Sequence, residues 1–440
     1  MSTSSKRRMP PTISWSDLRD RRVGVWGLGV EGRANLRKLA ALGIAPQALV
    51  DDRPAADDVL ATGDGGLDAL AGCDVVVKSP GISRTRADLQ SLESAGVPVA
   101  GGLGLWLAEA DRDRVLCITG TKGKSTTTAI AGHLATGLGQ RVLLGGNFGT
   151  APWDPEAPQD VDWWVVETSS YQATDVVLGP AVVAVTSLSQ DHLDWHGGPE
   201  HYYRDKLSLC RRPGVRRVVA DGDSPLLREH ADLLGSEVRW VRATDDPGWT
   251  GGLGLLGEHN VRNALVARAA LVELGVPGAD DDARIAAAAR DFAGLGSRLR
   301  PVGRVDGVDF VDDSLSTNVL PTLAAVDAFR GRRVVLLVGG HDRGIDYAPL
   351  AEGLTGRAHL LVLCLPDSGP RIAEALRAGA PDLDVREVPA LSDGVRAGFE
   401  WARPDGVVLL SPAAPSFGQY RDYADRAADF VRSMESLSQR

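Results

Sequence analysis

Short apolar runs rich in valine, leucine and isoleucine recur along the whole chain, and longer segments with helical periodicity separate them. In the first hundred residues, the runs 22–26, 47–50 and 74–78 are expected to be strands, and the segment 33–42 has the pattern of an amphipathic helix. Strands that alternate with helices in this way build α/β domains around parallel sheets. The pattern therefore predicts an α/β fold.

The same alternation continues to the carboxyl end of the chain, with one break. Further strands are expected at 115–119, 141–144, 163–167, 181–186, 215–221, 239–242, 308–311, 333–338, 360–364 and 407–410. The break is Gly294-Leu295-Gly296-Ser297-Arg298, which follows a strongly helical segment. Because 440 residues are too many for one ordinary core, we expect three domains, at residues 1–111, 112–300 and 301–440.

The clearest chemical signal is a Gly-rich turn after the first expected strand of the middle domain. It reads Gly120-Thr121-Lys122-Gly123-Lys124-Ser125-Thr126, and a helix of small residues follows. In such a loop, backbone N–H groups close around phosphate oxygens, Lys124 reaches the terminal phosphates, and Ser125 or Thr126 binds Mg²⁺. The loop is a shortened variant, since Thr119 stands where the usual pattern has glycine. The alternative is that Ser125 and Thr126 only cap a helix.

A second glycine cluster, Gly27-Leu28-Gly29-Val30-Glu31-Gly32, follows the first expected strand. Asp51 and Asp52 come about 20 residues later, at the end of the next strand, which completes a formal dinucleotide fingerprint. Taken alone, this favours an NAD enzyme. Two alternatives stay open: the glycines only permit close packing of strand and helix, or the crevice holds another pyrophosphate such as a UDP-sugar. The turn 79–82 follows a third strand and lies at the same edge of the sheet.

Polar residues with ligand chemistry follow two strands of the middle domain. Glu167 ends one strand, where a carboxylate beside a phosphate loop is well placed for Mg²⁺, unless it only caps a helix. His192 follows another strand and is a candidate metal ligand, unless the segment 191–194 is simply loop and cap. By pattern alone, Lys206 is an ordinary surface lysine on a helix.

In the last domain, three strands end in polar or Gly-rich turns, at residues 312–314, 339–343 and 411–416. The carboxyl ends of parallel strands meet at one edge, where open α/β sheets bind their ligands, so these turns predict a site there. His259 and Asn260 open the helical segment that precedes this domain, and they either contact a nucleotide base or cap the helix.

Composition narrows the range of partners. A net charge of −10 and a pI near 5.4 argue against a general binder of nucleic acid or anionic membranes and favour small molecules. The four cysteines are scattered without metal-ligand spacing, and no apolar segment approaches the roughly 20 residues that a membrane span needs. We expect a reduced, cytoplasmic, monomeric protein.

In their joint order, these motifs resemble those of the Mur ligase family, most closely its glutamate-adding members. The matching segments are Gly27-Leu28-Gly29, Ser79 to Ile82, Gly120 to Thr126, Gly146-Asn147, Glu167 to Gln172, Asp191 to Asp194, Tyr203 to Leu207, Gly257 to Asn260, Asp313-Ser314, Thr317-Asn318 and Ser411 to Ala413. The resemblance covers nearly the whole chain. It implies an ATP-dependent carboxylate–amine ligase that acts in peptidoglycan precursor synthesis.

The resemblance also implies three domains: an N-terminal Rossmann-like domain for UDP, a central P-loop ATPase domain, and a C-terminal Rossmann-like domain that brings the amino acid. The substrates would be ATP, UDP-N-acetylmuramoyl-L-alanine and glutamate, with two Mg²⁺ sites and a carbamylated Lys206. The substrate carboxylate would become an acyl phosphate, which the amine of the amino acid then attacks.

Residue roles follow from the same resemblance. The catalytic residues would be Lys124, Lys206, His192 and Glu167, and the metal ligands Ser125, Glu167, His192 and Lys206. The ATP contacts would be Gly120, Thr121, Lys122, Gly123, Lys124, Ser125, Thr126, Asn260, Asn263, Arg298 and Asp313. The UDP-substrate contacts would be Gly27, Gly29, Val30, Glu31, Asp51, Asp52, Arg53, Ser79, Asn147, Ser169 and Gln172. The glutamate contacts would be Thr317, Arg343, Ser416 and Tyr423.

The chain departs from the family pattern at three positions. Lys122 replaces the usual asparagine, and Leu315 and Arg343 stand where the D-glutamate-adding enzymes carry lysines for the glutamate carboxylates. Arginine grips a carboxylate with two parallel bonds and lysine acts as a point charge, so the two carboxylates would be held differently. The segments 25–33 and 191–197 also look more like an L-glutamate-adding variant, and we therefore favour L-glutamate over D-glutamate.

Two hypotheses of other classes remain at this stage. An NAD-dependent dehydrogenase explains the first glycine cluster but leaves the phosphate loop, Glu167 and His192 without a role. A non-enzymatic nucleotide sensor would bind ATP through the same loop without turnover.

Overall fold

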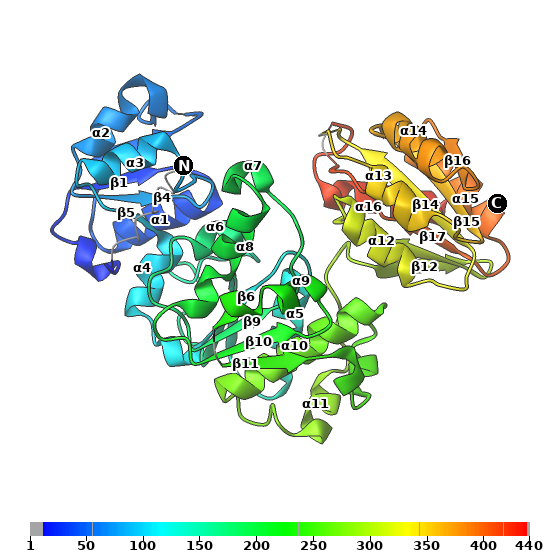
Figure 1. Ribbon diagram of the computed structural model, residues 1–440, viewed down its shortest axis with the longest axis horizontal. Coiled ribbons are helices and arrows are strands. Elements are labelled where there is room, and N and C mark those ends of the chain that lie inside the picture. Colours follow the sequence, from blue (N-terminus) through cyan, green and yellow to red (C-terminus); the bar gives the residue numbers. More distant parts are fainter. Residues whose placement is uncertain (1–11, 55, 236, 343, 417, 438–440) are drawn as a thin grey trace. The chain divides into compact units, whose positions relative to one another are not determined.

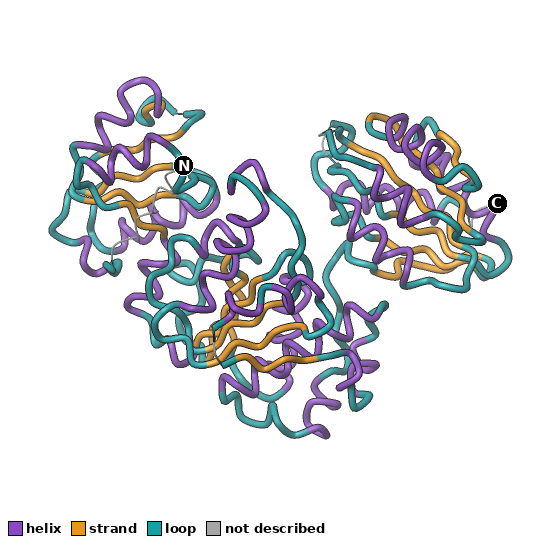
Figure 2. Tube along the Cα trace, in the orientation of Figure 1, coloured by secondary structure: helices purple, strands orange, loops and turns teal. Residues whose placement is uncertain are grey.

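Three sheets organise the protein in the computed structural model, which describes residues 12–54, 56–235, 237–342, 344–416 and 418–437 (Figure 1). Within each sheet the strands lie side by side and helices pack around them (Figure 2). The α/β fold expected from the hydrophobic pattern is therefore confirmed, and each strand named from that pattern is present within three residues of its expected limits.

The first sheet has the strand order β3-β2-β1-β4-β5, with parallel neighbours throughout. Its strands are β1 Val23–Trp26, β2 Ala48–Asp51, β3 Leu60–Ala61, β4 Val75–Lys78 and β5 Val99–Gly101. Its helices are α1 Val30–Ala41, α2 Leu67–Ala71, α3 Ala87–Ser94 and α4 Gly102–Glu109. Helix α1 covers one face, where Leu39 shares a core with Val25. Helices α2 and α3 cover the other face, where Leu89 packs with Val76.

The second sheet has the order β11-β10-β9-β6-β8-β7 and is also parallel. Its strands are β6 Val115–Thr119, β7 Val142–Gly146, β8 Trp163–Glu167, β9 Val182–Val185, β10 Arg217–Asp221 and β11 Val238–Val241. The helices along this part are α5 Lys124–Gly137, α6 Ser170–Ala173, α7 Leu193–His196, α8 Pro199–Leu207, α9 Pro225–Glu229, α10 Glu258–Leu274 and α11 Asp282–Ala288. Because β6 lies between β8 and β9, the Gly-rich turn opens at the middle of the carboxyl edge of this sheet.

The third sheet has the order β12-β13-β17-β14-β15-β16, with only the β12–β13 pair antiparallel. Its strands are β12 Arg300–Val305, β13 Val308–Asp312, β14 Val334–Gly340, β15 Leu360–Asp367, β16 Asp384–Glu387 and β17 Val407–Leu410. Its helices are α12 Val319–Asp327, α13 Ala348–Leu354, α14 Gly369–Gly379, α15 Leu391–Ala402 and α16 Tyr423–Glu435. Successive residues of β14 face opposite ways: Leu336 packs with α13 and α14, and Val335 packs with α15 and α16.

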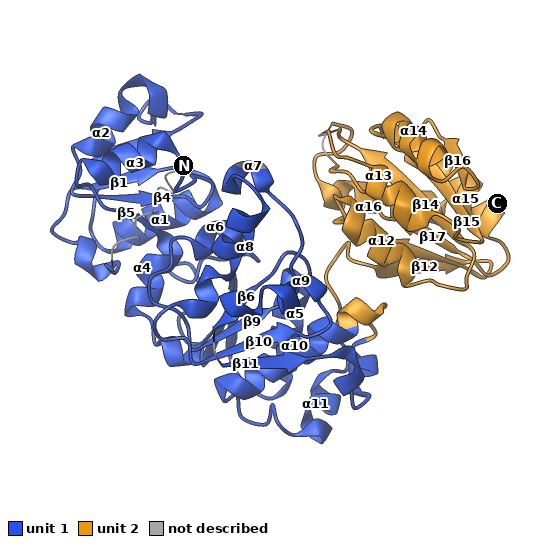
Figure 3. Cartoon of the chain, in the orientation of Figure 1, with its two compact units in different colours: residues 1–253, 261–292 blue, residues 254–260, 293–440 orange. Residues whose placement is uncertain are grey.

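The chain divides into two compact units (Figure 3). Unit 1 comprises residues 1–253 and 261–292, and unit 2 comprises residues 254–260 and 293–440. Unit 1 contains two sheets because one apolar core joins them: Val25 of the first sheet and Val166 of the second belong to the same buried cluster. The limits 1–111, 112–300 and 301–440 remain predictions of domain boundaries. In the described part of the chain, no helix combines the length and apolar character needed to cross a membrane.

Candidate active site

The Gly-rich turn joins β6 to α5, and two of its glycines are required by close approaches. Gly120 has φ +134°, and a Cβ there would lie 2.2 Å from the Thr186 hydroxyl. Gly123 has φ +89°, and a Cβ there would lie 2.4 Å from the Asn263 side-chain oxygen. Gly123 is also the N-cap of α5, and no side chain caps that helix. The alternative in which Ser125 and Thr126 serve as helix caps is therefore wrong.

The segment after β9 holds this loop in place. The Thr121 hydroxyl bonds the Ser189 carbonyl oxygen at 3.0 Å and the Tyr202 hydroxyl at 2.9 Å. The Lys122 ammonium pairs with Asp191 at 3.1 Å. These contacts fix the loop before any ligand arrives, so its backbone N–H groups are preorganised for phosphate oxygens.

Lys206 is buried, at 2% exposure, and not on the surface as its helical pattern suggested. Its ammonium group donates to the Gly120 carbonyl oxygen at 2.9 Å. Burial, and then the nearby Lys124 ammonium, hold the pKa of Lys206 well below its usual value. The surface assignment failed because α8 turns this side chain toward the phosphate loop, which its own sequence does not reveal.

Lys124 lies on the same loop, and its ammonium donates to the Thr121 carbonyl oxygen at 3.1 Å. The side-chain nitrogens of Lys122, Lys124 and Lys206 therefore surround a single turn of chain, and the low pKa of Lys206 leaves the charge there to Lys122 and Lys124. Positive charge at the N-terminus of a helix, beside the backbone N–H groups of a Gly-rich turn, is favourable for a polyphosphate.

Glu167 is buried at the end of β8, at 1% exposure. One of its carboxylate oxygens accepts a bond from the Asn147 amide at 2.8 Å, and the other, Oε2, has no hydrogen-bond partner. An unsatisfied buried carboxylate oxygen beside a phosphate loop fits a Mg²⁺ ligand. The helix that follows is capped by Ser169, so the alternative role of Glu167 as a helix cap is wrong.

The predicted metal ligands lie around this loop but do not form a preassembled cage. His192 begins α7 with φ +51°, and its side chain is 54% exposed. Burial of the ring lowers the pKa of His192, which keeps a ring nitrogen available as a ligand. Among the described residues, no group of three or more His, Cys, Asp and Glu side chains gathers as a metal site. Ser125 is half-buried at the start of α5.

Three residues assigned to the UDP-substrate lie together in unit 1. Ser169 and Gln172 form a reciprocal capping box at α6, with the Gln172 backbone N–H on the Ser169 hydroxyl at 3.2 Å. The Gln172 side-chain amide also donates to Glu31, the second residue of α1. Burial raises the pKa of Glu31 to about 7. The structure thus connects the first glycine cluster to the segment that follows Glu167.

The first glycine cluster is shaped for close approach to a ligand. Gly27 has φ +89°, and a Cβ there would lie 2.8 Å from Cβ of Ser79, whose hydroxyl donates to the Gly27 carbonyl oxygen at 2.7 Å. Gly29 has open space around it, and Val30 is 72% exposed at the start of α1. The helix N-terminus is therefore accessible to an anion.

Asp51, the last residue of β2, and Asp52, which follows it, both bond to other groups of unit 1. Asp51 accepts from the backbone N–H groups of Leu28 at 2.7 Å and Arg53 at 2.9 Å. Asp52 pairs with Arg86 at 2.6 Å, and this guanidinium holds the pKa of Asp52 below its usual value. Asp51 thus shapes the glycine turn itself, and Arg53 is exposed beside it.

The remaining residues that are predicted to contact ATP belong to both units. Asn263 lies in unit 1 and limits the space at Gly123. In unit 2, the Asn260 amide donates to the Leu256 carbonyl oxygen at 2.7 Å. Asp313 is buried and accepts from the Ser411 hydroxyl at 2.7 Å, and burial raises its pKa to about 6 although Arg298 lies close enough to oppose this. The backbone N–H of Leu299, the residue after Arg298, donates to the Asp313 carboxylate at 3.1 Å, so the chain at Arg298 lies beside Asp313.

The predicted glutamate residues belong to the turns at the carboxyl edge of the third sheet. Ser416 is buried, Thr317 is exposed, and Tyr423 is 42% exposed at the start of α16. Leu315 is half-buried, and its backbone N–H donates to the Ser297 carbonyl oxygen at 3.0 Å. Arg343 lies outside the described residues.

Sequence reasoning missed a buried chain of hydrogen bonds next to the phosphate loop. The His196 ring contacts the Ser170 hydroxyl at 2.9 Å through Nε2 and Asp205 at 2.7 Å through Nδ1. The connectivity is that of a hydrolase triad, but Ser170 is only 3% exposed and so is not an accessible nucleophile. The chain instead ties α6, α7 and α8 together. The available signal was that Ser170 and Asp205 fall inside the matched motifs and His196 lies two residues beyond one.

Sequence reasoning also missed a buried ion cluster between the two sheets of unit 1. Lys78, at the end of β4, bonds Asp175 at 2.5 Å, and Arg84 bonds the other oxygen of Asp175 at 2.7 Å. All three side chains are almost completely buried. A lysine inside a wholly apolar strand was the available signal, because such a charge needs a buried partner.

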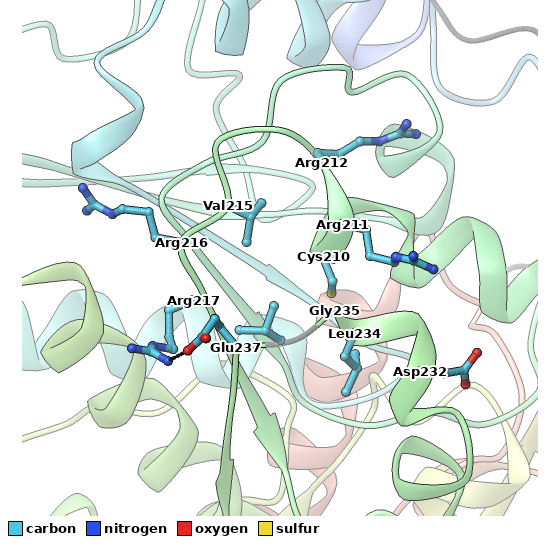
Figure 4. A pocket seen from close by; sticks show the side chains of 11 residues that line it. Cys210, Arg211, Arg212, Val215, Arg216, Arg217, Asp232, Leu234, Gly235 and Glu237 are labelled. Atoms are coloured by element: carbon cyan, nitrogen blue, oxygen red, sulfur yellow. Dashed lines mark hydrogen bonds and ion pairs between the residues drawn. The ribbon is translucent and has the colours of Figure 1, made fainter.

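A pocket of about 500 Å³ elsewhere in unit 1 has four arginines in its lining (Figure 4). Arg216 pairs with Asp113 at 2.9 Å, and Arg217 pairs with Glu237 at 2.5 Å. Its lining includes the first residues of β10, at the amino edge of the second sheet and so away from the phosphate loop. Because ion pairs neutralise two of its arginines, this pocket is a weaker candidate for a phosphate-binding site than the Gly-rich loop.

Comparison with known proteins agrees with this geometry. Residues 118–246 match the Mur ligase middle domain, and residues 297–414 match the Mur ligase glutamate ligase domain. The UDP-N-acetylmuramate-alanine ligase of Thermotoga maritima has a similar structure, with a TM-score of 0.57, 18% identity, and coverage of 95% of this chain and 100% of that one. MurF of Acinetobacter baumannii also has a TM-score of 0.57, with 17% identity, and coverage of 93% of this chain and 90% of that one. These likenesses show the fold.

Sequence relatives show the family. The UDP-N-acetylmuramoyl-L-alanine--L-glutamate ligase of Micromonospora sp. is 40% identical, over 96% of this chain and 98% of the relative. The protein of the same name from Xanthomonas axonopodis pv. citri is 39% identical, over 95% of this chain and 96% of the relative. The dehydrogenase suggested by the first glycine cluster and the non-enzymatic sensor are both set aside by this relationship. The chain belongs to the Mur ligase family of ATP-dependent, ADP-forming ligases.

Proposed function

We propose that the protein joins glutamate, with L-glutamate preferred, to the alanine carboxylate of UDP-N-acetylmuramoyl-L-alanine. ATP is consumed and ADP and phosphate are released, as a step of peptidoglycan precursor synthesis. The observation that carries the proposal is the preorganised phosphate loop with Lys124 and Lys206 at its centre. The relatives that are named for this activity match nearly the full length of the chain. They support the choice of substrates.

The first sheet is proposed to hold the UDP part and not NAD. Gly27, Gly29 and Val30 leave the N-terminus of α1 open to a pyrophosphate, and Ser79 braces the turn. The two sheets of unit 1 are joined by the bond from Gln172 to Glu31. This connection suits one substrate that extends from the UDP end to a reactive carboxylate near Asn147 and Ser169. The limits of the three domains and their Rossmann-like and P-loop types belong to this proposal.

In the first chemical step, the alanine carboxylate attacks the γ-phosphorus of ATP, the bond to the ADP oxygen breaks, and an acyl phosphate forms. Lys124 offsets the negative charge that is shared between the attacking and leaving oxygens. Ser125, Glu167, His192 and a carbamylated Lys206 would hold Mg²⁺, which supplies further positive charge against the phosphate oxygens when bound. Asn260, Asn263, Arg298 and Asp313 complete the proposed ATP contacts.

The proposed carbamylation of Lys206 follows from its burial. A lowered pKa favours the neutral amine, which adds CO₂ to form a carbamate and releases one proton. An ammonium would repel Mg²⁺, whereas the carbamate offers it oxygens. The number of metal sites is proposed to be two.

In the second step, the glutamate amine attacks the acyl carbon, the carbon–oxygen bond to phosphate breaks, and phosphate leaves as the amide loses a proton. Thr317, Ser416 and Tyr423, with Arg343, are proposed to hold the glutamate. The D-glutamate-adding enzymes carry a lysine at the position of Leu315, so this chain has one cation fewer there. The two carboxylates of the bound glutamate would therefore be held differently than in those enzymes. We propose that the enzyme works as a monomer in the cytoplasm, on small molecules.

The acyl-phosphate route is tested with UDP-N-acetylmuramoyl-L-alanine labelled with ¹⁸O in its carboxylate. In the presence of ATP, Mg²⁺ and glutamate, one labelled oxygen is expected in the released inorganic phosphate for each amide formed. Amide formation in which the expelled labelled oxygen appears in water and none appears in the released phosphate would contradict the acyl phosphate. ATP hydrolysis without any amide would contradict the ligase assignment.

A further inference from the structure

Arg426 is a buried arginine whose position none of the roles above explains. It lies in the first half of α16 and is only 1% exposed. Its guanidinium bonds backbone carbonyl oxygens: that of Ser314 at 2.8 Å and that of Ala414 at 3.3 Å, with a longer contact of 3.5 Å to Gly339. A fully buried arginine normally pairs with a carboxylate, so a set of carbonyl partners needs an explanation.

These three carbonyl groups come from three separate strand ends. Ser314 follows β13, Gly339 is near the end of β14, and Ala414 follows β17. The three strands are neighbours in the order β13-β17-β14, so their turns line one continuous stretch of the carboxyl edge. A planar fork with several N–H groups can hold three turns in one arrangement, which a flexible ammonium cannot do.

The same turns carry the residues proposed for the incoming amino acid. Thr317 follows the first turn, and Ser416 ends the third. The turns also bond one another, since the Gly339 N–H donates to Pro412 and the His341 N–H donates to Pro415, both at 2.8 Å. The space is tight: a Cβ on Gly340 would lie 2.3 Å from the Pro415 oxygen and 3.0 Å from Arg426.

We propose that Arg426 is a positioning residue for the incoming amino acid, because its guanidinium fixes the three turns that present the amino-acid contacts. The inference rests on the proposed function of this edge. Arg426 acts through the turns and does not touch the substrate. The side-chain nitrogen Nε of Arg426 has no hydrogen-bond partner among the described residues, so the partners of this guanidinium are carbonyl groups of the turns. The Asp312 carboxylate acts on it only through space.

The test compares Arg426→Lys and Arg426→Gln with Arg432→Gln, which changes an exposed arginine of the same helix that pairs with Asp429. Steady-state kinetics of the full chain would give KM for glutamate, ATP and UDP-N-acetylmuramoyl-L-alanine. We expect KM for glutamate to rise about 10-fold in Arg426→Gln and by a smaller factor in Arg426→Lys, with the other two KM values within about twofold of wild type in both variants. Arg432→Gln should match wild type.

The charge-conserving Arg426→Lys keeps the proposal testable if Arg426→Gln does not fold. Equal rises in all three KM values, or a lower thermal midpoint with every KM unchanged, would overturn the positioning role. The smaller rise expected in Arg426→Lys follows because lysine still reaches one carbonyl group. Failure of the proposed function would look different, since the wild-type enzyme would then form no amide with glutamate.

Discussion

At the scale of single residues, Lys124 carries the first test. Lys124→Ala removes the ammonium that we propose faces the transferring phosphoryl group, while its contact to the Thr121 carbonyl oxygen adds little to the fold. We expect kcat/KM to fall by about 100-fold or more with an unchanged thermal midpoint. Lys38→Ala, which removes a lysine paired with Glu109, is the matched control. Near-normal turnover in Lys124→Ala would disprove the assignment of the loop.

Lys206 provides a second residue-scale prediction. If its carbamate helps to hold Mg²⁺, Lys206→Ala should be almost inactive, and a short carboxylic acid such as formate or acetate should restore part of the activity by filling the vacated space. The readout is the initial rate of ADP release against carboxylate concentration. Full activity in the alanine variant would leave the buried amine with a purely structural role.

The raised pKa of Asp313 predicts that the local stability of unit 2 depends on pH. Its pKa is raised from 3.8 to about 6, so between these values the folded state keeps a proton that the unfolded chain has lost. Its contribution to stability is therefore complete below pH 4 and is lost as the pH rises through 6, by up to about 3 kcal/mol. Hydrogen exchange of β13 and β17, corrected for intrinsic rates, should show this slope in wild type and a flatter one in Asp313→Asn. Equal slopes would refute it.

The sequence anticipated residues whose chemistry shows in their type and spacing. Lys124 was recognised from the Gly-rich turn and Glu167 from its place at a strand end, whereas Ser169 was assigned only through the family resemblance. Burial and partner choice were not predictable: Lys206 was taken for a surface lysine, although α8 turns it into the interior. Arg426 was missed because its partners are backbone carbonyls from three distant turns, which have no signature in the sequence.

At the scale of elements, the phosphate loop depends on glycine for steric reasons. Gly123→Ala would place a methyl group 2.4 Å from the Asn263 side-chain oxygen, at φ +89°. The turn must open, and we expect ATP affinity measured by calorimetry to fall about 10-fold or more. Gly251→Ala, at a site with open space and no positive φ, is the control. Unchanged ATP affinity in Gly123→Ala would show that the loop is not the phosphate site.

Strand positions were the most predictable elements, because buried parallel strands are short apolar runs whose ends coincide with glycine or polar residues. Helix starts were less accurate: α1 begins at Val30, although the periodic pattern places its start at residue 33. The first turn of α1 contains glycine and an exposed valine and so lacks amphipathic periodicity. Capping likewise depends on geometry, as Ser169 caps α6 and Gly123 precedes α5 without any side-chain cap.

At the scale of the whole molecule, three sheets were expected and three are present. The grouping of the first two sheets into one compact unit was not predicted, because it depends on long-range contacts such as the buried pair Lys78 and Asp175. The order of the motifs identified the family from sequence, since no single motif separates a ligase from a dehydrogenase or a sensor. We propose that the choice between glutamate enantiomers depends on Leu315 and Arg343, where the sequence departs from that of the D-glutamate-adding enzymes.

The central claim is that this ligase adds L-glutamate to UDP-N-acetylmuramoyl-L-alanine. If the amine is fixed at the acyl phosphate, inverting the α-carbon moves at least one carboxylate, and leaving a buried charge unpaired costs several kcal/mol. The direct measurement is amide formation with ATP, Mg²⁺, the UDP-substrate and each glutamate enantiomer in parallel, followed by mass spectrometry and ADP release. We predict a higher kcat/KM for L-glutamate, and a weaker preference in the double variant Leu315→Lys, Arg343→Lys. Efficient use of D-glutamate with no product from L-glutamate would contradict the account.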